Sequence, residues 1–348
     1  MGRLFFARGT PKRALIMLGL AILCLASTLA AAGCGDSEKA KPIFEDKQLV
    51  EAADVVNLKD FPKTDGKKNL IAIVSEVGAD TDLSMAPGAT EMIQGERNRL
   101  PFGLFSAESK PIWAPTVIYL AKDDKSPATG PFAAPGAAIV VPKDFRSETS
   151  KSDYGKLGNG IYIADFKAPK ANQTKILTVS NINGKYHTSN QPISLLKEPT
   201  TPKIGDKAPN IETPTVQSAG GPSKIKTIET RVPPDSMHEI SLKTALAQKK
   251  PVVISFSTPL LCVSRVCGPV TDIAEYLNSR YSDQVVFIHN EIYNNNKVED
   301  GFRSQVGAFG LPTEPYTFVI DRNGRIAAKF EGPLTVPELE AAVIKVSK

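Results

Sequence analysis

The sequence predicts two folded parts, an all-β sandwich followed by an α/β domain, behind an N-terminal targeting segment. Short strand-like runs separated by proline and glycine fill residues 67–197. Apolar runs of strand length then alternate with helical patterns over residues 236–348. A chain of 348 residues is long enough for about two domains of ordinary size.

The first 33 residues are typical of a secretion signal. Basic side chains precede an apolar run at 14–32, and small residues then lead to Cys34, which polar residues follow. This segment resembles a bacterial lipobox, although Ala31 stands where that pattern prefers Leu, Val or Ile. The resemblance implies that Cys34 is lipidated and anchors the protein to the outer face of the cell membrane. Cleavage after the alanine run and an uncleaved anchor are the alternatives.

Residues 34–66 are polar and rich in Lys and Asp, which predicts a flexible tether. The net charge of the whole chain is +5, and it falls to about +1 without the basic start. A nearly neutral mature chain offers no basic surface for a phosphate backbone, so we expect no nucleic-acid partner. Outside the cell membrane, disulfides persist, which makes the cysteines the residues of most interest.

Short strand-like runs predict an all-β fold for residues 67–197. Alternation of apolar and polar residues is clearest at 161–166, and the segments between runs are too rich in proline for helices. We therefore expect an immunoglobulin-like sandwich, with the sole tryptophan, Trp113, packed in its core or at an edge. The predicted strands are 70–74, 100–105, 116–120, 138–141, 160–166, 176–179 and 193–196.

A linker rich in Pro, Thr and Lys at 198–235 separates the sandwich from the α/β part. Ser241 is placed to cap a first helix, and Asn323-Gly324 predicts a hairpin turn. The predicted order is helix, strand, helix, strand, helix, two hairpin strands and helix. The strands are 252–256, 285–288, 316–320 and 325–330; the later helices lie at 270–277 and 298–309 and from Thr335 onward.

This order, with cysteines after the first central strand, resembles the thioredoxin fold over about residues 237–348. The sequence Val-Cys-Gly-Pro-Val at 266–270 is similar to the thioredoxin signature Trp-Cys-Gly-Pro-Cys. Residues 314–324 look like the cis-proline strand and hairpin of membrane-anchored extracytoplasmic thioredoxins. The resemblance implies thiol–disulfide chemistry, with Pro315 as the cis-proline that faces the dithiol.

Two departures from the thioredoxin pattern affect the site. Val270 occupies the position of the usual resolving cysteine, so that Cys262, five residues before Cys267, is its only possible partner. Ser255 stands where thioredoxins keep a buried carboxylate. Glu314 could replace that carboxylate, or could simply be solvated or paired within the hairpin.

The cysteine pair can close only if one member lies outside a continuous helix, because residues five apart in a helix are about 8 Å apart. Pro269 favours a helix start that leaves Cys267 near the N-terminus and Cys262 in the preceding loop. We expect the helix dipole to lower the pKa of Cys267, which would then attack while Cys262 resolves. The reverse assignment stays open.

The leading hypothesis is a thiol–disulfide oxidoreductase that acts on a protein disulfide or dithiol and exchanges electrons with a redox partner. A peroxiredoxin-like thiol peroxidase is an alternative, since Thr258-Pro259 precedes Cys262. A non-enzymatic adaptor with a structural disulfide is another. We expect no cofactor and no metal, because the three histidines show no ligand spacing with the cysteines.

Overall fold

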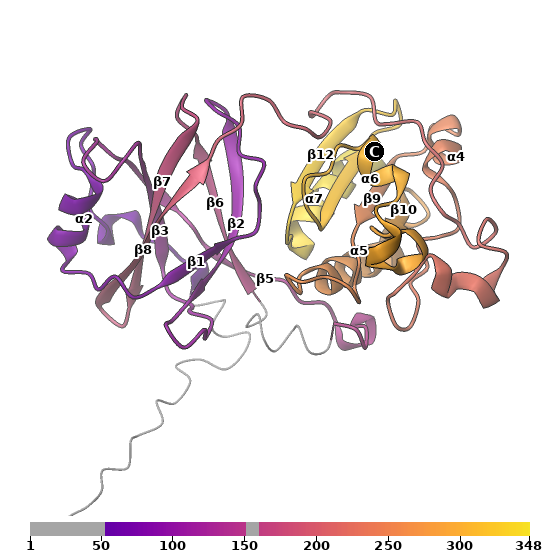
Figure 1. The fold of residues 1–348 in the computed structure, drawn as a ribbon, viewed down its shortest axis with the longest axis horizontal. Helices are drawn as coiled ribbons and strands as arrows, with labels where there is room; N and C mark the ends of the chain where they lie inside the picture. Colours follow the sequence, from indigo (N-terminus) through magenta and orange to yellow (C-terminus); the bar gives the residue numbers. More distant parts are fainter. Residues whose placement is uncertain (1–52, 151–159) are drawn as a thin grey trace, which may run out of the picture. The chain divides into compact units, whose positions relative to one another are not determined.

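The computed structural model describes residues 53–150 and 160–348 (Figure 1). These described residues fall into one compact unit. Cys34, the predicted signal and the first part of the predicted tether lie outside the described residues. In the part of the chain that is described, no helix combines the length and the apolar character needed to cross a membrane.

The first half contains two antiparallel four-stranded sheets, in the orders β1-β2-β6-β5 and β4-β3-β7-β8. The chain passes from one sheet to the other after every second strand. Alternate residues of their strands, such as Phe102, Ile118 and Tyr162, form one buried core, to which Trp113 also belongs. The predicted all-β character is confirmed, whereas the immunoglobulin-like topology stays a prediction. The strands are β1 (Ser84–Pro87), β2 (Arg97–Phe105), β3 (Thr116–Ala121), β4 (Thr129–Ala133), β5 (Gly136–Ala138), β6 (Gly160–Lys167), β7 (Gln173–Ile182) and β8 (Lys185–Ser194).

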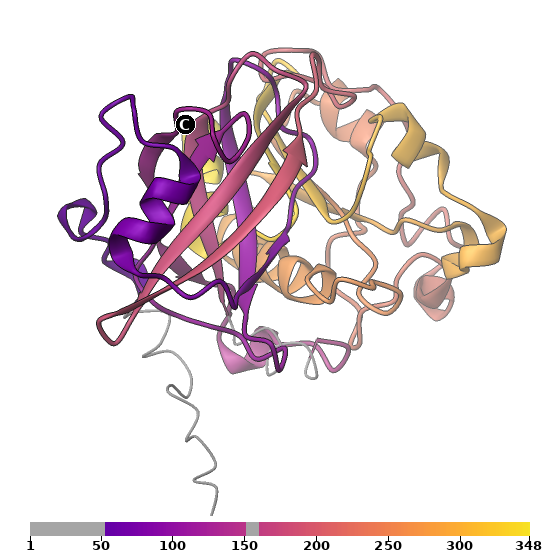
Figure 2. The same cartoon turned by 60° about the vertical axis from the view of Figure 1, so that its left-hand side comes forward.

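The predicted strand at 70–74 is wrong, because these residues begin the helix α2 (Leu70–Val77). Asn69 caps the helix by accepting a hydrogen bond from the Ala72 amide at 2.8 Å, and Gly78 ends it in the left-handed conformation. Leu70 belongs to the same buried cluster as Val117 and Tyr119 of β3, and β3 is therefore buried on both faces. Figure 2 shows the indigo ribbon of α2 at the outside of this half. The capping residues Asn69 and Gly78, on either side of the apolar run, favour a helix over a strand.

The predicted strands at 138–141 and 193–196 also differ from the structure. β5 ends at Ala138 and β8 ends at Ser194, so most of the first predicted run and half of the second lie beyond the strands. Ile139 and Val141 instead join the core of the α/β part, next to residues such as Val270. These apolar residues therefore reflect contact between two parts of the chain and carry no strand pairing.

The second half forms a mixed sheet in the order β10-β9-β11-β12, with β10 parallel to β9 and β11 antiparallel to it. This is the arrangement expected of a thioredoxin-like domain. Its strands are β9 (Val252–Phe256), β10 (Val286–Asn290), β11 (Tyr316–Ile320) and β12 (Ile326–Glu331). Its helices are α4 (Leu242–Ala247), α5 (Cys267–Tyr281), α6 (Ser304–Ala308) and α7 (Val336–Ser347).

The ends of these elements follow the sequence signals closely, with one exception. Ser241 caps α4, and Thr335 forms a reciprocal capping box with Glu338 at the start of α7. The helix predicted at 298–309 is only the short α6, preceded by a single 3-10 turn. Gly301, with φ of 74°, ends that turn and breaks the helical path.

Glu91, which follows β1, makes a buried polar junction with the α/β part. Its Oε2 accepts hydrogen bonds from Lys329 Nζ at 2.8 Å and from the Tyr316 hydroxyl at 2.9 Å. The Thr201 hydroxyl donates to the same oxygen at 2.6 Å. Burial opposes ionisation of Glu91, but the hydrogen bonds from Lys329 and Thr201 outweigh it and lower the pKa of Glu91 to about 2.

Candidate active site

Cys262 and Cys267 come together where the loop after β9 meets the start of α5. Both are free thiols. Their sulfur atoms and a carboxylate oxygen of Glu314 lie within 4.8 Å of one another. Cys262 is partly exposed, whereas Cys267 is fully buried with an exposed fraction of 0%. One sulfur can therefore meet a substrate while the other stays behind it.

The start of α5 fixes this arrangement. Cys267 is the first helical residue, as predicted from Pro269, and Val266 precedes it as the N-cap. Gly268 comes next and packs closely, because a Cβ there would lie 2.6 Å from Ser150 Oγ. A side chain at this position would require either Ser150 or the helix start to shift.

The environment of Cys262 stabilises its thiolate. A hydrogen bond from the Cys267 thiol is the main cause that lowers the pKa of Cys262 to about 6, against the opposing effect of burial. The Ser264 hydroxyl, 3.2 Å from Cys262 Sγ, also contributes. So do the backbone N–H groups of Cys267 and Val266, which lie at the N-terminus of α5.

The expectation that Cys267 would have a lowered pKa is wrong. Burial raises the pKa of the Cys267 thiol well above its ordinary value, and the interaction with Cys262 and the charge of Glu314 raise it further. The helix N-terminus was correctly placed in the sequence, but its N–H groups act on the sulfur in front of the helix, which is that of Cys262. The structure thus favours ionisation of Cys262 over ionisation of Cys267.

Glu314 lies beside both thiols. Its Oε2 is 3.6 Å from Cys267 Sγ, and the peptide bond between Glu314 and Pro315 is cis, as predicted. Burial, followed by the negative charge of Cys262, raises the pKa of Glu314 to about 8. Ser255, in contrast, is buried and lies 3.2 Å from the Thr317 hydroxyl on the neighbouring strand.

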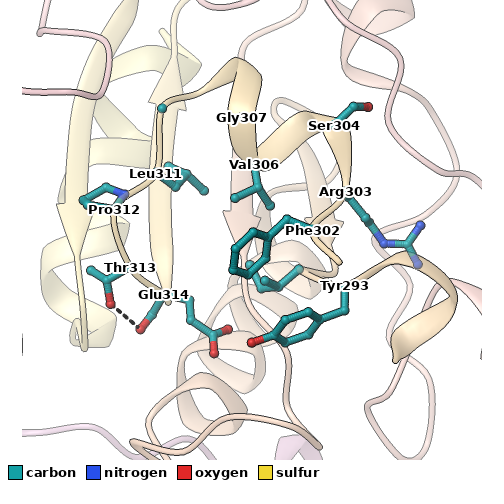
Figure 3. Close-up of a pocket in the computed structure, with 12 residues that line it drawn as sticks. Tyr293, Phe302, Arg303, Ser304, Val306, Gly307, Leu311, Pro312, Thr313 and Glu314 are labelled. Atoms are coloured by element: carbon teal, nitrogen blue, oxygen red, sulfur yellow. Dashed lines mark hydrogen bonds between the residues drawn. The ribbon is translucent and has the colours of Figure 1, made fainter. Parts of the chain in front are cut away.

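Two cavities reach Glu314. The first has a volume of about 470 Å³ and is bordered by Tyr293, Phe302 and the residues before Glu314. In Figure 3, the hydroxyl end of Tyr293 points toward the Glu314 carboxylate. The second, of about 280 Å³, lies between Ser264 and Val266 of the cysteine loop and apolar residues of β1 and β2. The dithiol therefore lies beside space that can accept a bound chain.

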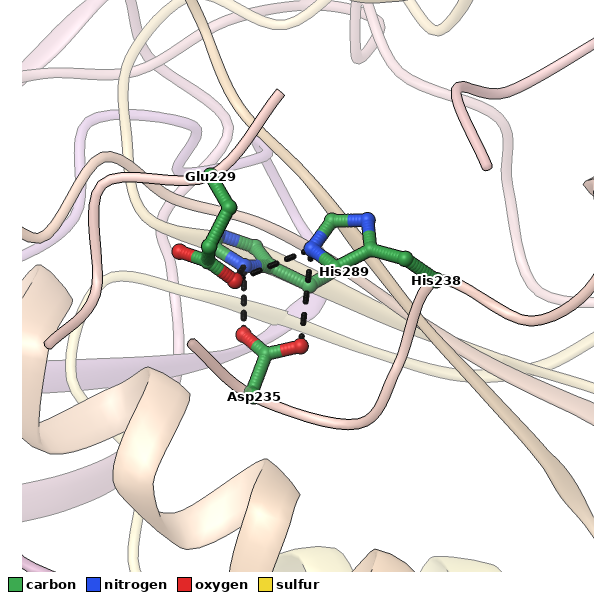
Figure 4. Close-up of side chains that lie close together, drawn as sticks. All are labelled: Glu229, Asp235, His238 and His289. Carbon is green, nitrogen blue, oxygen red and sulfur yellow. Dashed lines mark hydrogen bonds and ion pairs between the residues drawn. The ribbon is translucent and has the colours of Figure 1, made fainter. Parts of the chain in front are cut away.

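Sequence reasoning missed the cavity residue Tyr293 and a buried cluster of Glu229, Asp235, His238 and His289 (Figure 4). A signal was present for the cluster, since His289 stands in an apolar strand and three acidic or histidine residues occur within the ten positions 229–238. Both histidines of the cluster pair with its carboxylates.

No family model matches the sequence, and no curated protein matches it. Among solved structures, a putative thiol:disulfide interchange protein DsbE from Chlorobium tepidum is similar, with 15% identity and a TM-score of 0.31, over 42% of this chain and 100% of that chain. A DsbF homologue from Corynebacterium diphtheriae is similar with 18% identity and a TM-score of 0.26, over 32% of this chain and 79% of that chain. The assignment of the fold rests on the sheet order and on the position of the cysteines.

Proposed function

We propose that this protein is a thiol–disulfide oxidoreductase whose nucleophile is Cys262. The observation that carries the proposal is the pairing of a partly exposed thiol of low pKa with a buried thiol of high pKa. A thiolate is the attacking species in disulfide exchange, and a pKa of about 6 leaves Cys262 mostly ionised near neutral pH.

In the first step, the Cys262 thiolate attacks one sulfur of a substrate disulfide. The substrate S–S bond breaks, a mixed disulfide with Cys262 forms, and the other substrate sulfur leaves as a thiolate that takes a proton from water. The Cys267 thiol stays protonated during this step, because its pKa is raised by burial.

In the second step, Cys267 resolves the mixed disulfide. Once Cys262 is part of the mixed disulfide, its negative charge no longer raises the pKa of Glu314, and the Glu314 carboxylate, 3.6 Å from Cys267 Sγ, takes the Cys267 proton. The new thiolate attacks the Cys262 sulfur, the Cys262–Cys267 disulfide forms, and the second substrate sulfur leaves as a thiolate that takes the proton from Glu314. The substrate has gained two electrons and two protons. A dithiol partner then returns the protein to its reduced form. The same steps occur in the reverse order when a client dithiol is oxidised.

A protein client fits the surface around Cys262. Leu260, Val263 and Phe302 are 65%, 94% and 64% exposed, which is unusual for apolar side chains so close to one reactive group. Phe302 also lines the larger cavity beside Glu314. An unfolded or loosely folded polypeptide would cover this apolar surface and present its cysteines to Cys262.

The proposed location is the outer face of the cell membrane, with lipidated Cys34 as the anchor and residues 34–66 as the tether. The β-sandwich, proposed to be immunoglobulin-like, would hold the dithiol away from the lipid surface. Mass spectrometry of the mature N-terminus tests the anchor: an acylated cysteine supports it, and an unmodified Gly33 or Cys34 contradicts it.

The function itself is tested by trapping. The reduced Cys267→Ser variant is mixed with a disulfide-containing protein such as insulin, and the products are separated without reductant. We expect a covalent adduct through Cys262, whereas the matched Cys262→Ser variant forms none. Adducts only in the Cys262→Ser variant, or no insulin reduction by the wild type, would refute the proposal.

A thiol peroxidase is a second candidate, because a thiolate with a pKa of about 6 also suits attack on a peroxide. The two activities are separated by rate. Rapid formation of a sulfenic acid at Cys262 with hydrogen peroxide, together with slow insulin reduction, would favour the peroxidase.

A further inference from the structure

A second cluster of ionisable groups lies in the α/β part, away from solvent. Glu229, Asp235, His238 and His289 have side-chain exposed fractions of 0%, 0%, 1% and 0%. One ligand-type atom from each lies within 4.8 Å of every other (Figure 4). The four residues come from the segment before α4 and from β10, so that folding alone brings them together.

Each of the two carboxylates contacts both histidines. Glu229 Oε2 lies 2.9 Å from His238 Nε2 and 3.2 Å from His289 Nδ1. Asp235 Oδ2 lies 2.8 Å from His289 Nδ1, and Asp235 Oδ1 lies 3.5 Å from His238 Nε2. Each nitrogen carries at most one proton but faces two carboxylates. Ligands placed about 2.0–2.1 Å from a tetrahedral Zn²⁺ are separated by roughly 3.3 Å, close to these distances.

The surroundings hold the ligand atoms in place. The Arg231 amide donates to Glu229 Oε1 at 2.6 Å, which leaves Glu229 Oε2 facing both histidines. The Met237 amide donates to Asp235 Oδ1 at 2.9 Å, which leaves Asp235 Oδ2 facing His289. His289 Nε2 lies 3.1 Å from the Ser257 carbonyl oxygen, which can accept the N–H of Nε2 while Nδ1 faces the carboxylates. Such outer contacts are typical of residues that ligate metals.

The charges of these groups suit a cation. As metal ligands the two imidazoles would be neutral and the two carboxylates ionised, so the four side chains would bring a charge of −2 to the bound ion in a site closed to water. A divalent ion would neutralise it. Imidazole nitrogen with carboxylate oxygen is a ligand set that suits Zn²⁺, and four protein ligands with no open position are typical of a structural site.

We propose that Glu229, Asp235, His238 and His289 form a structural zinc site. The site would stabilise the base of the redox loop. His289 contacts the Ser257 carbonyl, the Ser257 hydroxyl lies 2.7 Å from that of Thr271, and Thr271 donates to the carbonyl of Cys267 at 2.9 Å. Zinc would thus fix the polypeptide from which Cys262 and Cys267 project, without touching either sulfur.

Metal content is measured first. The full chain is purified in detergent without chelators, dialysed, and analysed by inductively coupled plasma mass spectrometry. We expect one zinc per chain in the wild type and in the Cys262→Ser/Cys267→Ser double variant. The His187→Gln variant is a matched control, because His187 pairs with Asp82 outside the cluster.

Conservative variants test the ligands. His238→Gln and Asp235→Asn keep size and hydrogen bonding but are poorer ligands, and we expect at least a tenfold loss of retained zinc. Because such variants could misfold, the wild type is also stripped with a strong chelator and titrated with ZnCl₂. We expect the Tm to rise by about 5 °C or more, with no rise from MgCl₂.

Cobalt substitution identifies the donor atoms. The Co²⁺-loaded chain should show the visible bands of a tetrahedral site and no near-ultraviolet thiolate-to-cobalt band. The proposal is overturned if the wild type holds no zinc and zinc leaves its Tm unchanged. It is equally overturned if the double cysteine variant loses the metal, or if His238→Gln and Asp235→Asn both retain a full equivalent.

Discussion

A buried and a partly buried carboxylate in this protein have pKa values displaced in opposite directions. Glu91, at the junction after β1, has its pKa lowered to about 2, whereas Glu314, at the dithiol, has its pKa raised to about 8. Burial acts in the same direction on both. Glu91 faces the ammonium of Lys329 and the Thr201 hydroxyl, while Glu314 faces the sulfur of Cys267 and the negative charge of Cys262.

The difference shows that the groups in contact with a carboxylate determine the direction of its pKa shift, and therefore its role. A carboxylate held by a cation stays ionised and serves stability, whereas one beside thiols is ready to take up a proton and serves chemistry. An ionised carboxylate paired with a cation, such as Glu91, adds little to the free energy of the folded state. A carboxylate beside thiols, such as Glu314, is expected to destabilise the folded state near neutral pH. Four measurements test this contrast.

The largest effect is expected at the nucleophile. Cys262→Ser should reduce insulin reduction to the uncatalysed background, because Cys267 is fully buried and mostly protonated and cannot replace it. Turbidity from insulin precipitation measures the rate. Residual turnover in Cys262→Ser comparable to the wild type would show that the buried thiol attacks, as the sequence alone had suggested.

Glu314→Gln should slow the resolving step by roughly 10²-fold, the usual size of a general-base effect. The same variant should be more stable than the wild type by about 2 kcal/mol at pH 7. The sign follows from the raised pKa of Glu314: its unfavourable contribution grows as the pH rises from 4.5 toward about 8.

Quenched-flow trapping of the mixed disulfide measures the rate of the Glu314 variant, and urea unfolding of the reduced protein measures its stability. Thr313→Ser, beside it on the same cavity wall, is the matched control and should leave resolution unchanged within about twofold. A destabilised Glu314→Gln with normal resolution would assign this carboxylate a structural role.

Glu91→Gln should have the opposite effect on stability, a loss of about 3 kcal/mol at pH 7. Since the pKa of Glu91 is lowered, its contribution is complete above pH 4.5 and is lost as the pH falls through about 2. The wild type should therefore lose stability over this range, and the variant should lose less. Urea unfolding from pH 2 to pH 7 measures the free energy of unfolding of both proteins. The same dependence on pH in the two proteins would contradict the stabilising role of ionised Glu91.

The smallest effect concerns the hydrogen bond between the thiols. Alkylation of Cys262 by iodoacetamide should reach half its maximal rate near pH 6, and rise with pH as the thiolate forms. Cys267→Ala removes the main cause of the lowered pKa of Cys262, and should move the midpoint upward by about one pH unit. Peptide mass spectrometry follows the rate, and an unmoved midpoint would leave the backbone N–H groups as the cause.

The sequence predicted most of the α/β part, because its signals are local. Ser241 and Thr335 cap the helices where expected, Asn323-Gly324 forms the hairpin turn, and Pro315 follows a cis peptide bond. Apolar runs of strand length gave β9, β10 and β11 within one residue or two of their bounds.

What the sequence could not show depends on distance in space. The buried state of Cys267 comes from packing around the start of α5, including the approach of Ser150 to Gly268, and no local pattern encodes it. The cluster at Glu229 and His289 unites residues 60 positions apart. The segment of α2 was predicted as a strand because a short apolar run is compatible with the periodicity of a helix and with that of a strand. The residues that cap the helix, Asn69 and Gly78, distinguish the two.

The hydrogen bonds that converge on Cys262 have a consequence for the direction of electron flow. They favour the thiolate, a species that exists only when the pair is reduced, and so they weaken the oxidised form relative to it. A couple whose dithiol state is stabilised in this way draws electrons from its partners. We therefore expect the Cys262–Cys267 disulfide to be more easily reduced than the disulfide of a pair without these hydrogen bonds.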